Sequence, residues 1–147
     1  MKKGEHWEAS ALAAALRDSD GAKAGRLVVE AANGDSIQVS LPECGNLGVA
    51  VGVVRPRIMA SVALVKASEI PNRAAFDRSL LVANPTLPLS AFSLTQVDGE
   101  DYYGIYGELS TGSEIEEIEE EILTLGANAI HAMETIEAWK AGGKAGN

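Results

Sequence analysis

An unbroken apolar stripe near the C-terminal end constrains the fold of this 147-residue chain more than any other feature. Between residues 115 and 139, apolar side chains recur at alternating steps of three and four residues. This spacing keeps them on one side of a helix about 40 Å long. We therefore predict a long amphipathic helix, whose stripe consists of Ile115, Ile118, Ile122, Leu125, Ala129, Ala132, Ile136 and Trp139.

We make a different prediction for each end of this helix. At its start, Ser113 and Glu116 have the spacing of a capping box, in which each side chain binds a backbone N–H at the helix terminus. At its end, a helix of this length overhangs a small domain, so we expect the turns around Ile136 and Trp139 to lack an intrachain partner. Gly126 makes a thin place in the middle that would admit a close neighbour. The stripe can therefore pack on a sheet alone or also contact a second copy in a homodimer.

The rest of the chain alternates between helical and strand-like patterns. Residues 49–66 are β-branched and apolar around a Pro-containing turn, and form either one interrupted strand or a hairpin. Turn-forming Asn-Gly and Asp-Gly pairs separate the other strand-like runs. The expected elements are a helix over 5–17, strands over 26–31 and 36–41 joined by a type I′ turn at Asn33-Gly34, a helix over 73–83 capped by Asn72, and strands over 87–94 and 102–109.

These elements predict an α+β fold in a single domain, 1–147, with frayed ends at 1–4 and 141–147. Their order is α-β-β-β-α-β-β-α, which favours a mainly antiparallel sheet of five to six strands with helices packed on it. Hydrophobic residues make up 46% of the chain and charged residues 22%, the balance of an ordinary globular domain.

Composition also indicates a compartment. The lone cysteine, Cys44, excludes an intrachain disulfide, which is typical of a reducing environment. The start of the chain lacks the apolar core of an export signal, and its apolar runs are far shorter than the roughly 20 residues that span a bilayer. We therefore expect a cytoplasmic protein that is not membrane-spanning.

The net charge of -9 is unevenly distributed along the chain. Residues 1–78 are nearly balanced, whereas residues 79–139 contain twelve acidic residues and no Lys or Arg. Binding to nucleic acid depends on cations that neutralise phosphates. This half of the chain is therefore not expected to bind nucleic acid.

Six of the eight residues from 114 to 121 are glutamates. They can be a solvated helix face, or they can form a docking surface for a basic segment of a protein partner. A divalent-metal site is disfavoured because no calcium-type loop accompanies them. Like charges four residues apart, such as Glu116 and Glu120, oppose helix formation by a few tenths of a kcal/mol, so local stability alone does not favour the cluster. The residues predicted to bind a protein partner are Glu116, Glu117, Glu120, Glu121, Ile136 and Trp139.

Motifs for catalysis, cofactors or metals are not found. His6 and His131 are the only histidines, and their spacing with Cys44 does not resemble a zinc site. The sequence has no nucleophile elbow, P-loop or dinucleotide fingerprint. We therefore predict no catalytic, cofactor-binding or metal-binding residues and no enzymatic activity. The alternative is a small-molecule-binding or enzymatic domain with a pocket near Tyr102, Tyr103 and His131.

Several short segments resemble the YjfI-like family of bacterial proteins of unknown function. They are Leu87-Pro88-Leu89-Ser90, Gly99-Glu100-Asp101-Tyr102-Tyr103, Gly107-Glu108-Leu109-Ser110 and the glutamate-rich helix from Ser113 through Asn128. The resemblance is sharp from about residue 71 onward and implies no activity and no catalytic residues. The element order is also similar to that of type III secretion chaperones and YbjN-like proteins, which are small, acidic and often dimeric adaptors. The leading hypothesis is therefore a non-catalytic, chaperone-like adaptor that forms a homodimer and binds a protein partner.

Overall fold

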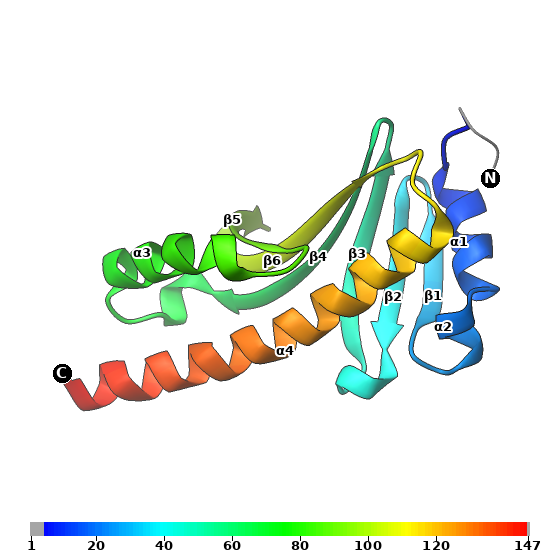
Figure 1. Ribbon diagram of the computed structural model, residues 1–147. Coiled ribbons are helices and arrows are strands. Elements are labelled where there is room, and N and C mark those ends of the chain that lie inside the picture. The colour runs from blue at the N-terminus through cyan, green and yellow to red at the C-terminus, as the bar shows by residue number, and fades with distance from the viewer. Residues whose placement is uncertain (1–4, 147) are drawn as a thin grey trace.

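Alternating apolar residues shape six strands, which pair into one antiparallel sheet (Figure 1). The computed structural model describes residues 5–146, and side chains from 5 to 142. The strand order across the sheet is β1-β2-β3-β4-β6-β5. The strands are β1 Val28–Asn33, β2 Ser36–Leu41, β3 Leu47–Val54, β4 Arg57–Lys66, β5 Ala91–Val97 and β6 Glu100–Ser110. The helices are α1 Ala9–Arg17, α2 Asp20–Lys23, α3 Arg73–Ala83 and α4 Ile115–Gly146, with short 3-10 turns at Pro42–Cys44, Ala67–Glu69 and Asn84–Thr86.

The longer helices pack on the same face of the sheet. In β3, Val49, Val51 and Val53 point into the core beneath α1 and α4, whereas Gly48 and Ala50 lie on the opposite face. Small and polar residues predominate on that opposite face, although Met59, Val97 and Tyr106 also line it. An antiparallel sheet can leave such a face in water. The predicted α+β class, the antiparallel sheet and the long C-terminal helix are confirmed. The expected fraying of residues 1–4 lies outside the described residues, and that of 141–147 stays a prediction.

Residues 49–66 form a hairpin, which resolves the alternative that the sequence left open. Strands β3 and β4 pair up to Val54 and Arg57 at the turn. In the first hairpin the loop residues are Gly34 and Asp35, because Asn33 already pairs with Ser36. Only Gly34 has a positive φ, 60°, which is the pattern of a type II′ turn, so the expected type I′ turn is wrong.

Several predicted boundaries also move. Helix α1 begins at Ala9 instead of residue 5, and β1 begins at Val28 instead of residue 26. Strand β5 begins at Ala91 instead of residue 87, because a 3-10 turn and a left-handed Leu89, with φ of 61°, precede it. Asn72 precedes α3 as expected, but it adopts a left-handed conformation and its side chain makes no capping hydrogen bond.

Helix α4 crosses the sheet diagonally and buries its stripe in the chain's own core (Figure 1). It begins at Ile115, one residue later than the predicted capping box requires, and the carbonyl of Ser113 instead accepts a hydrogen bond from the Trp7 indole at 2.8 Å. The stripe residues 0–4% exposed are Ile118, Ile122, Leu125, Ala129, Ala132 and Ile136. The core, not a partner, therefore covers the stripe.

The turns of α4 around Ile136 and Trp139 pack against α3 and β6, so their expected lack of an intrachain partner is wrong. Ile136 belongs to a second buried cluster with Phe76 of α3 and Tyr103 of β6. The Trp139 ring meets Phe76 edge-on, with ring centroids 5.2 Å apart, and its indole donates a hydrogen bond to the carbonyl of Pro71 at 2.8 Å. Helix α3 and the loop before it extend the domain far enough to receive these turns.

Gly126 does admit a close neighbour, and that neighbour is in the same chain. A Cβ at this position would collide with the Leu41 side chain at the end of β2, and would lie 3.4 Å from Cys44 Sγ. The glycine therefore lets α4 approach the sheet and does not mark a contact with a second copy. None of the described helices is both long and apolar enough to cross a membrane.

Candidate functional site

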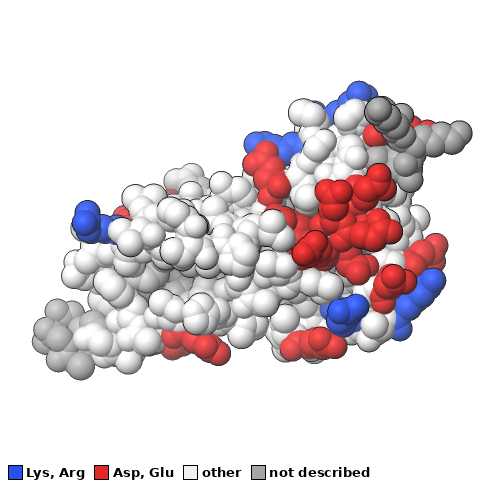
Figure 2. Space-filling model, viewed as in Figure 1, with Lys and Arg blue, Asp and Glu red and all other residues white. Residues whose placement is uncertain are grey.

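The first turns of α4 present an acidic surface to solvent. Figure 2 shows acidic side chains gathered over the N-terminal part of this helix. Glu116, Glu117 and Glu120 are exposed, and Glu119 accepts a hydrogen bond from the backbone N–H of Gly21 at 3.1 Å. Within residues 5–142, none of these four carboxylates forms an ion pair with Lys or Arg. We name Glu116, Glu117 and Glu120 the acidic face.

Glu121 does not belong to this face, although the sequence grouped it there. Its side chain is only 3% exposed, and Oε1 packs against Gly107 of β6. Burial raises the pKa of the Glu121 carboxyl, and the charge of Glu120 raises it further. Glu121 therefore contributes to the packing of α4 on the sheet and cannot meet a partner at the surface.

Ile136 and Trp139 are likewise turned inward. Ile136 is 4% exposed, and Trp139 is half-buried against α3. Six residues were predicted from the sequence to bind a partner. Three of them therefore expose their side chains to solvent, and the other three pack against other parts of the same chain.

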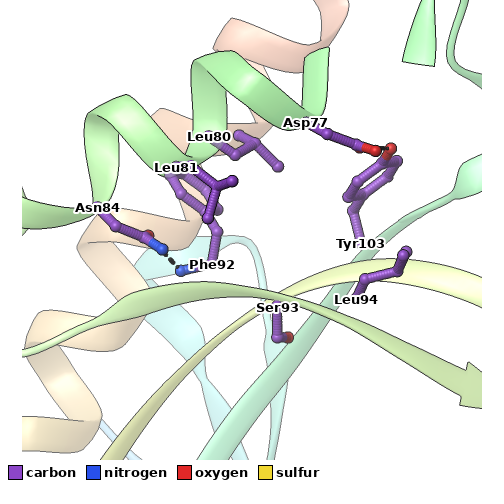
Figure 3. Close-up of a pocket in the computed structure, with 8 residues that line it drawn as sticks. All are labelled: Asp77, Leu80, Leu81, Asn84, Phe92, Ser93, Leu94 and Tyr103. Carbon is purple, nitrogen blue, oxygen red and sulfur yellow. Dashed lines mark hydrogen bonds between the residues drawn. The ribbon is translucent and has the colours of Figure 1, made fainter. Parts of the chain in front are cut away.

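An apolar pocket of about 170 Å³ lies between α3 and the edge strand β5 (Figure 3). Leu80 and Leu81 of α3 face Phe92 and Leu94 of β5 across it, and Tyr103 of β6 closes one end. Pockets for small molecules and cofactors are typically about 300–1,000 Å³. This pocket therefore has room for a side chain and not for a cofactor.

The polar groups around the pocket are already paired. The Tyr103 hydroxyl donates a hydrogen bond to Asp77, and its ring meets Phe76 edge-on at 4.9 Å between centroids. Burial raises the pKa of the Tyr103 phenol, and its hydrogen bond to Asp77 raises it further. Tyr103 therefore stays neutral at ordinary pH and holds α3 on the sheet.

Most of the exposed large hydrophobic residues in the described chain lie near this pocket or on strand β5. Seven large hydrophobic residues are exposed in the described chain, and five of them lie between residues 81 and 97. They are Leu81 (71%), Val82 (65%), Leu89 (52%), Leu94 (49%) and Val97 (44%). We name these five residues the neutral surface, because residues 79–97 contain no charged side chain. Val97 lies on the other face of β5 from Leu94. This surface was not predicted from the sequence, although the charge-free run was a signal that could have revealed it.

The alternative pocket near Tyr102, Tyr103 and His131 does not form. Tyr103 lines the pocket at α3, but Tyr102 points to the opposite face of β6, and His131 is exposed on α4. Cys44 is half-buried against the main core cluster. Among the described residues, no group of three or more His, Cys, Asp or Glu side chains could hold a metal ion.

Comparisons with known proteins agree on family and fold. A family model described as uncharacterised proteins conserved in bacteria (DUF2170) matches residues 6–140. The uncharacterised protein YjfI of Escherichia coli K12 is 27% identical over 105 residues, which is 71% of this chain and 79% of that protein. The resemblance inferred from the sequence is therefore confirmed.

Three solved structures share the fold at low sequence identity. The structure of the ExsC-ExsE complex contains a chain with a TM-score of 0.63 and 15% identity, and the match covers 88% of this chain and 97% of that one. YbjN from E. coli matches with a TM-score of 0.54 and 16% identity over 82% of this chain and 89% of its own. The HopA1-SchA chaperone-effector complex matches with a TM-score of 0.52 and 16% identity over 92% and 98%.

Proposed function

We propose, from the premise that this chain belongs to the DUF2170 family of bacterial proteins, that it is a non-catalytic, chaperone-like adaptor in the cytoplasm. In this proposal the protein is a homodimer, and each copy binds a basic segment of a protein partner on the acidic face. The fold supports this class of function, because one protein of the same fold is described as part of a chaperone-effector complex.

The acidic face carries the proposal. Glu116 and Glu120 are four residues apart on one helix, so their repulsion opposes the helix. Only acids in the first turn gain from the helix dipole, by about 0.3–1 kcal/mol each. Glu116 and Glu117 lie in the first turn and share this gain, whereas Glu120 lies beyond it, and no Lys or Arg among residues 5–142 pairs with any of the three. Folding alone therefore does not favour Glu120 beside Glu116. A basic partner segment would turn this repulsion into attraction.

The apolar stripe is not part of the proposed binding surface. Its members from Ile118 to Ile136 are covered by the sheet and by α3, so they offer nothing to a partner. The proposed binding surface is therefore smaller than the one the sequence predicted, and it consists of Glu116, Glu117 and Glu120.

Affinity capture followed by a binding assay tests this proposal. Partners are captured from native cells, identified by mass spectrometry, purified and titrated against the full chain at 50 and 300 mM salt. Exposed charge pairs contribute about 0.2–1 kcal/mol each, so replacing Glu116, Glu117 and Glu120 by Gln should raise the Kd about tenfold at low salt. The replacement should also reduce the salt dependence of binding.

A matched triple variant serves as the control. Glu43→Gln, Glu134→Gln and Glu137→Gln change the net charge by the same amount at exposed positions elsewhere. This variant should bind like the wild type. Equal losses in both variants, or no loss in the first, would rule out the acidic face as the docking site.

A further inference from the structure

The two edges of the sheet differ in how they are protected. Edge strand β1 has a bulge between Val29 and Ala31, and it carries Glu30. Edge strand β5 carries no charge, no proline and no bulge, and its last four residues are exposed. An uncharged, regular edge strand is a template for pairing with another chain. Strand β5 therefore has the features of an edge strand that pairs with a strand from another chain.

Hydrogen bonding along β5 shows which backbone groups are free. The backbone N–H of Phe92 donates a hydrogen bond to Asn84 Oδ1 at 2.7 Å (Figure 3). The backbone polar groups of Phe92 therefore point away from β6. Backbone groups in an antiparallel strand alternate in direction, so those of Leu94 and Gln96 also point outward. Strand β5 ends the described sheet, and these groups have no strand partner in it. Asn84 thus caps one end of the edge and leaves two residues open.

Charge decides between the occupants of this edge. Each copy of the chain carries a net charge of -9, so two copies repel unless they meet where charge is absent. The neutral surface includes Leu94 and Val97 of β5 and lies in the charge-free run 79–97. A basic segment would gain no electrostatic attraction at this edge. A second copy carries the same negative charge, so it needs an uncharged surface of this kind to bind.

We infer that a second copy of this chain pairs with β5 through β5 itself, in an antiparallel arrangement around a two-fold axis. In one possible register, the free backbone N–H and C=O groups of Leu94 form hydrogen bonds with those of Gln96 in the second copy. By symmetry, the same groups of Gln96 bind Leu94 of the second copy. This register places Thr95 on the axis. It joins two six-stranded sheets into one and brings Leu81 and Val82 of the two α3 helices toward each other. The inference rests on the homodimer in the proposed function and names the surface that forms it.

Oligomeric state in solution tests the surface. Sedimentation velocity of the full wild-type chain should give twice the monomer mass of 15.4 kDa. The variant Val82→Glu/Leu94→Glu should be a folded monomer, because forming the dimer would bury like charges of the two copies close to the two-fold axis. Val54 is a matched control because it is 62% exposed, against 65% for Val82, and lies at the β3–β4 turn. Val54→Glu should remain a dimer. A monomeric wild type, or a Val82→Glu/Leu94→Glu dimer, would overturn the inference.

Cysteine cross-linking tests the register. Directly opposed residues in a non-hydrogen-bonded antiparallel pair have Cα atoms about 4.5 Å apart, within the range for a disulfide. In a Cys44→Ser background, Thr95→Cys should therefore form a covalent dimer under mild oxidation. Ser93→Cys is the control, because the two Ser93 positions lie about 13 Å apart along the strands in this register. Cross-linking through Ser93→Cys, or none through Thr95→Cys, would overturn this register.

The same variants separate this inference from the proposed function. A Val82→Glu/Leu94→Glu monomer that still captures the protein partner leaves both standing, because the acidic face is on another surface. A wild-type dimer that captures no partner contradicts the adaptor but not the interface. A wild-type monomer that captures a partner contradicts the interface and the homodimer, but leaves the acidic face as the docking site.

Discussion

At the scale of single residues, the buried position of Glu121 has the clearest consequence for protonation and stability. It is the only charged side chain buried in the described part of the chain. The helical pattern could have revealed this, since Glu121 lies three residues after Ile118 and four before Leu125, on the buried side of α4. Glu121 was grouped with its exposed neighbours because the six glutamates between residues 114 and 121 look alike in the sequence.

The raised pKa of Glu121 predicts how stability depends on pH. The folded state holds a proton on this carboxyl more tightly than the unfolded chain does. Its contribution to stability is therefore complete below the unfolded pKa and is lost as pH rises through the folded pKa. Replacement by Gln removes the buried charge, so Glu121→Gln should raise the Tm at pH 7.5 by a few degrees and leave it nearly unchanged at pH 4.

Thermal unfolding followed by circular dichroism across this pH range checks the prediction. Glu134→Gln, exposed and further along the same helix, is the matched control and should not show the same pH dependence. A Tm gain for Glu121→Gln that is equal at both pH values would mean that the charge of Glu121 is not the cause.

At the scale of elements, periodic patterns predicted helices and strands well where burial enforces them. Alternation located the strands around residues 36–41 and 102–109, and the three-four spacing located α4. The error at β5 has a physical origin: residues 87–90 are apolar enough to resemble a strand, but Pro88 and the left-handed Leu89 belong to a loop held by α4. Asn128 donates hydrogen bonds to the carbonyl of Pro88 and to Ser90 Oγ, a long-range contact that no local pattern contains.

The end of α4 shows a second limit of local patterns. The stripe predicts which side chains are apolar but not which element covers them, so the docking of Trp139 on Phe76 could not be foreseen. The same limit hid the neutral surface. The stripe of α3 was expected at Phe76, Leu80 and Ala83, and exposure of the adjacent Leu81 and Val82 depends on how that helix lies over β5.

Trp139 should anchor the second buried cluster. Trp139→Ala removes the ring contact with Phe76 and the hydrogen bond to Pro71. Because Trp139 is half-buried, we expect a loss of about 2–3 kcal/mol, below the 3–5 kcal/mol typical of fully buried Trp or Phe. Hydrogen exchange should accelerate in α3 and in the last turns of α4, while the turns of α4 beneath the main core keep their protection.

The exposed Glu134→Ala on the same helix is the control for this prediction and should leave exchange unchanged. Uniform acceleration along the whole of α4 in Trp139→Ala would show that the two buried clusters open together.

At the scale of the whole molecule, charge is arranged by region. The acidic face and the charge-free run 79–97 lie within one half of the chain that contains no Lys or Arg through residue 139. Composition predicted the negative half correctly, but only the fold separates it into an acidic face on α4 and a neutral surface at β5. A chain with a charge of -9 can thus offer one surface for cations and another for a like-charged copy.

This arrangement predicts how salt affects stability. Repulsion within the acidic face opposes folding, and salt screens exposed charges with a Debye length of about 10 Å at 0.1 M. The Tm should therefore rise between 20 and 300 mM NaCl. The triple variant Glu116→Gln/Glu117→Gln/Glu120→Gln should have a higher Tm than the wild type at 20 mM and a smaller rise with salt. The triple variant at Glu43, Glu134 and Glu137 changes net charge equally, so a matching reduction there would assign the effect to net charge and not to the acidic face.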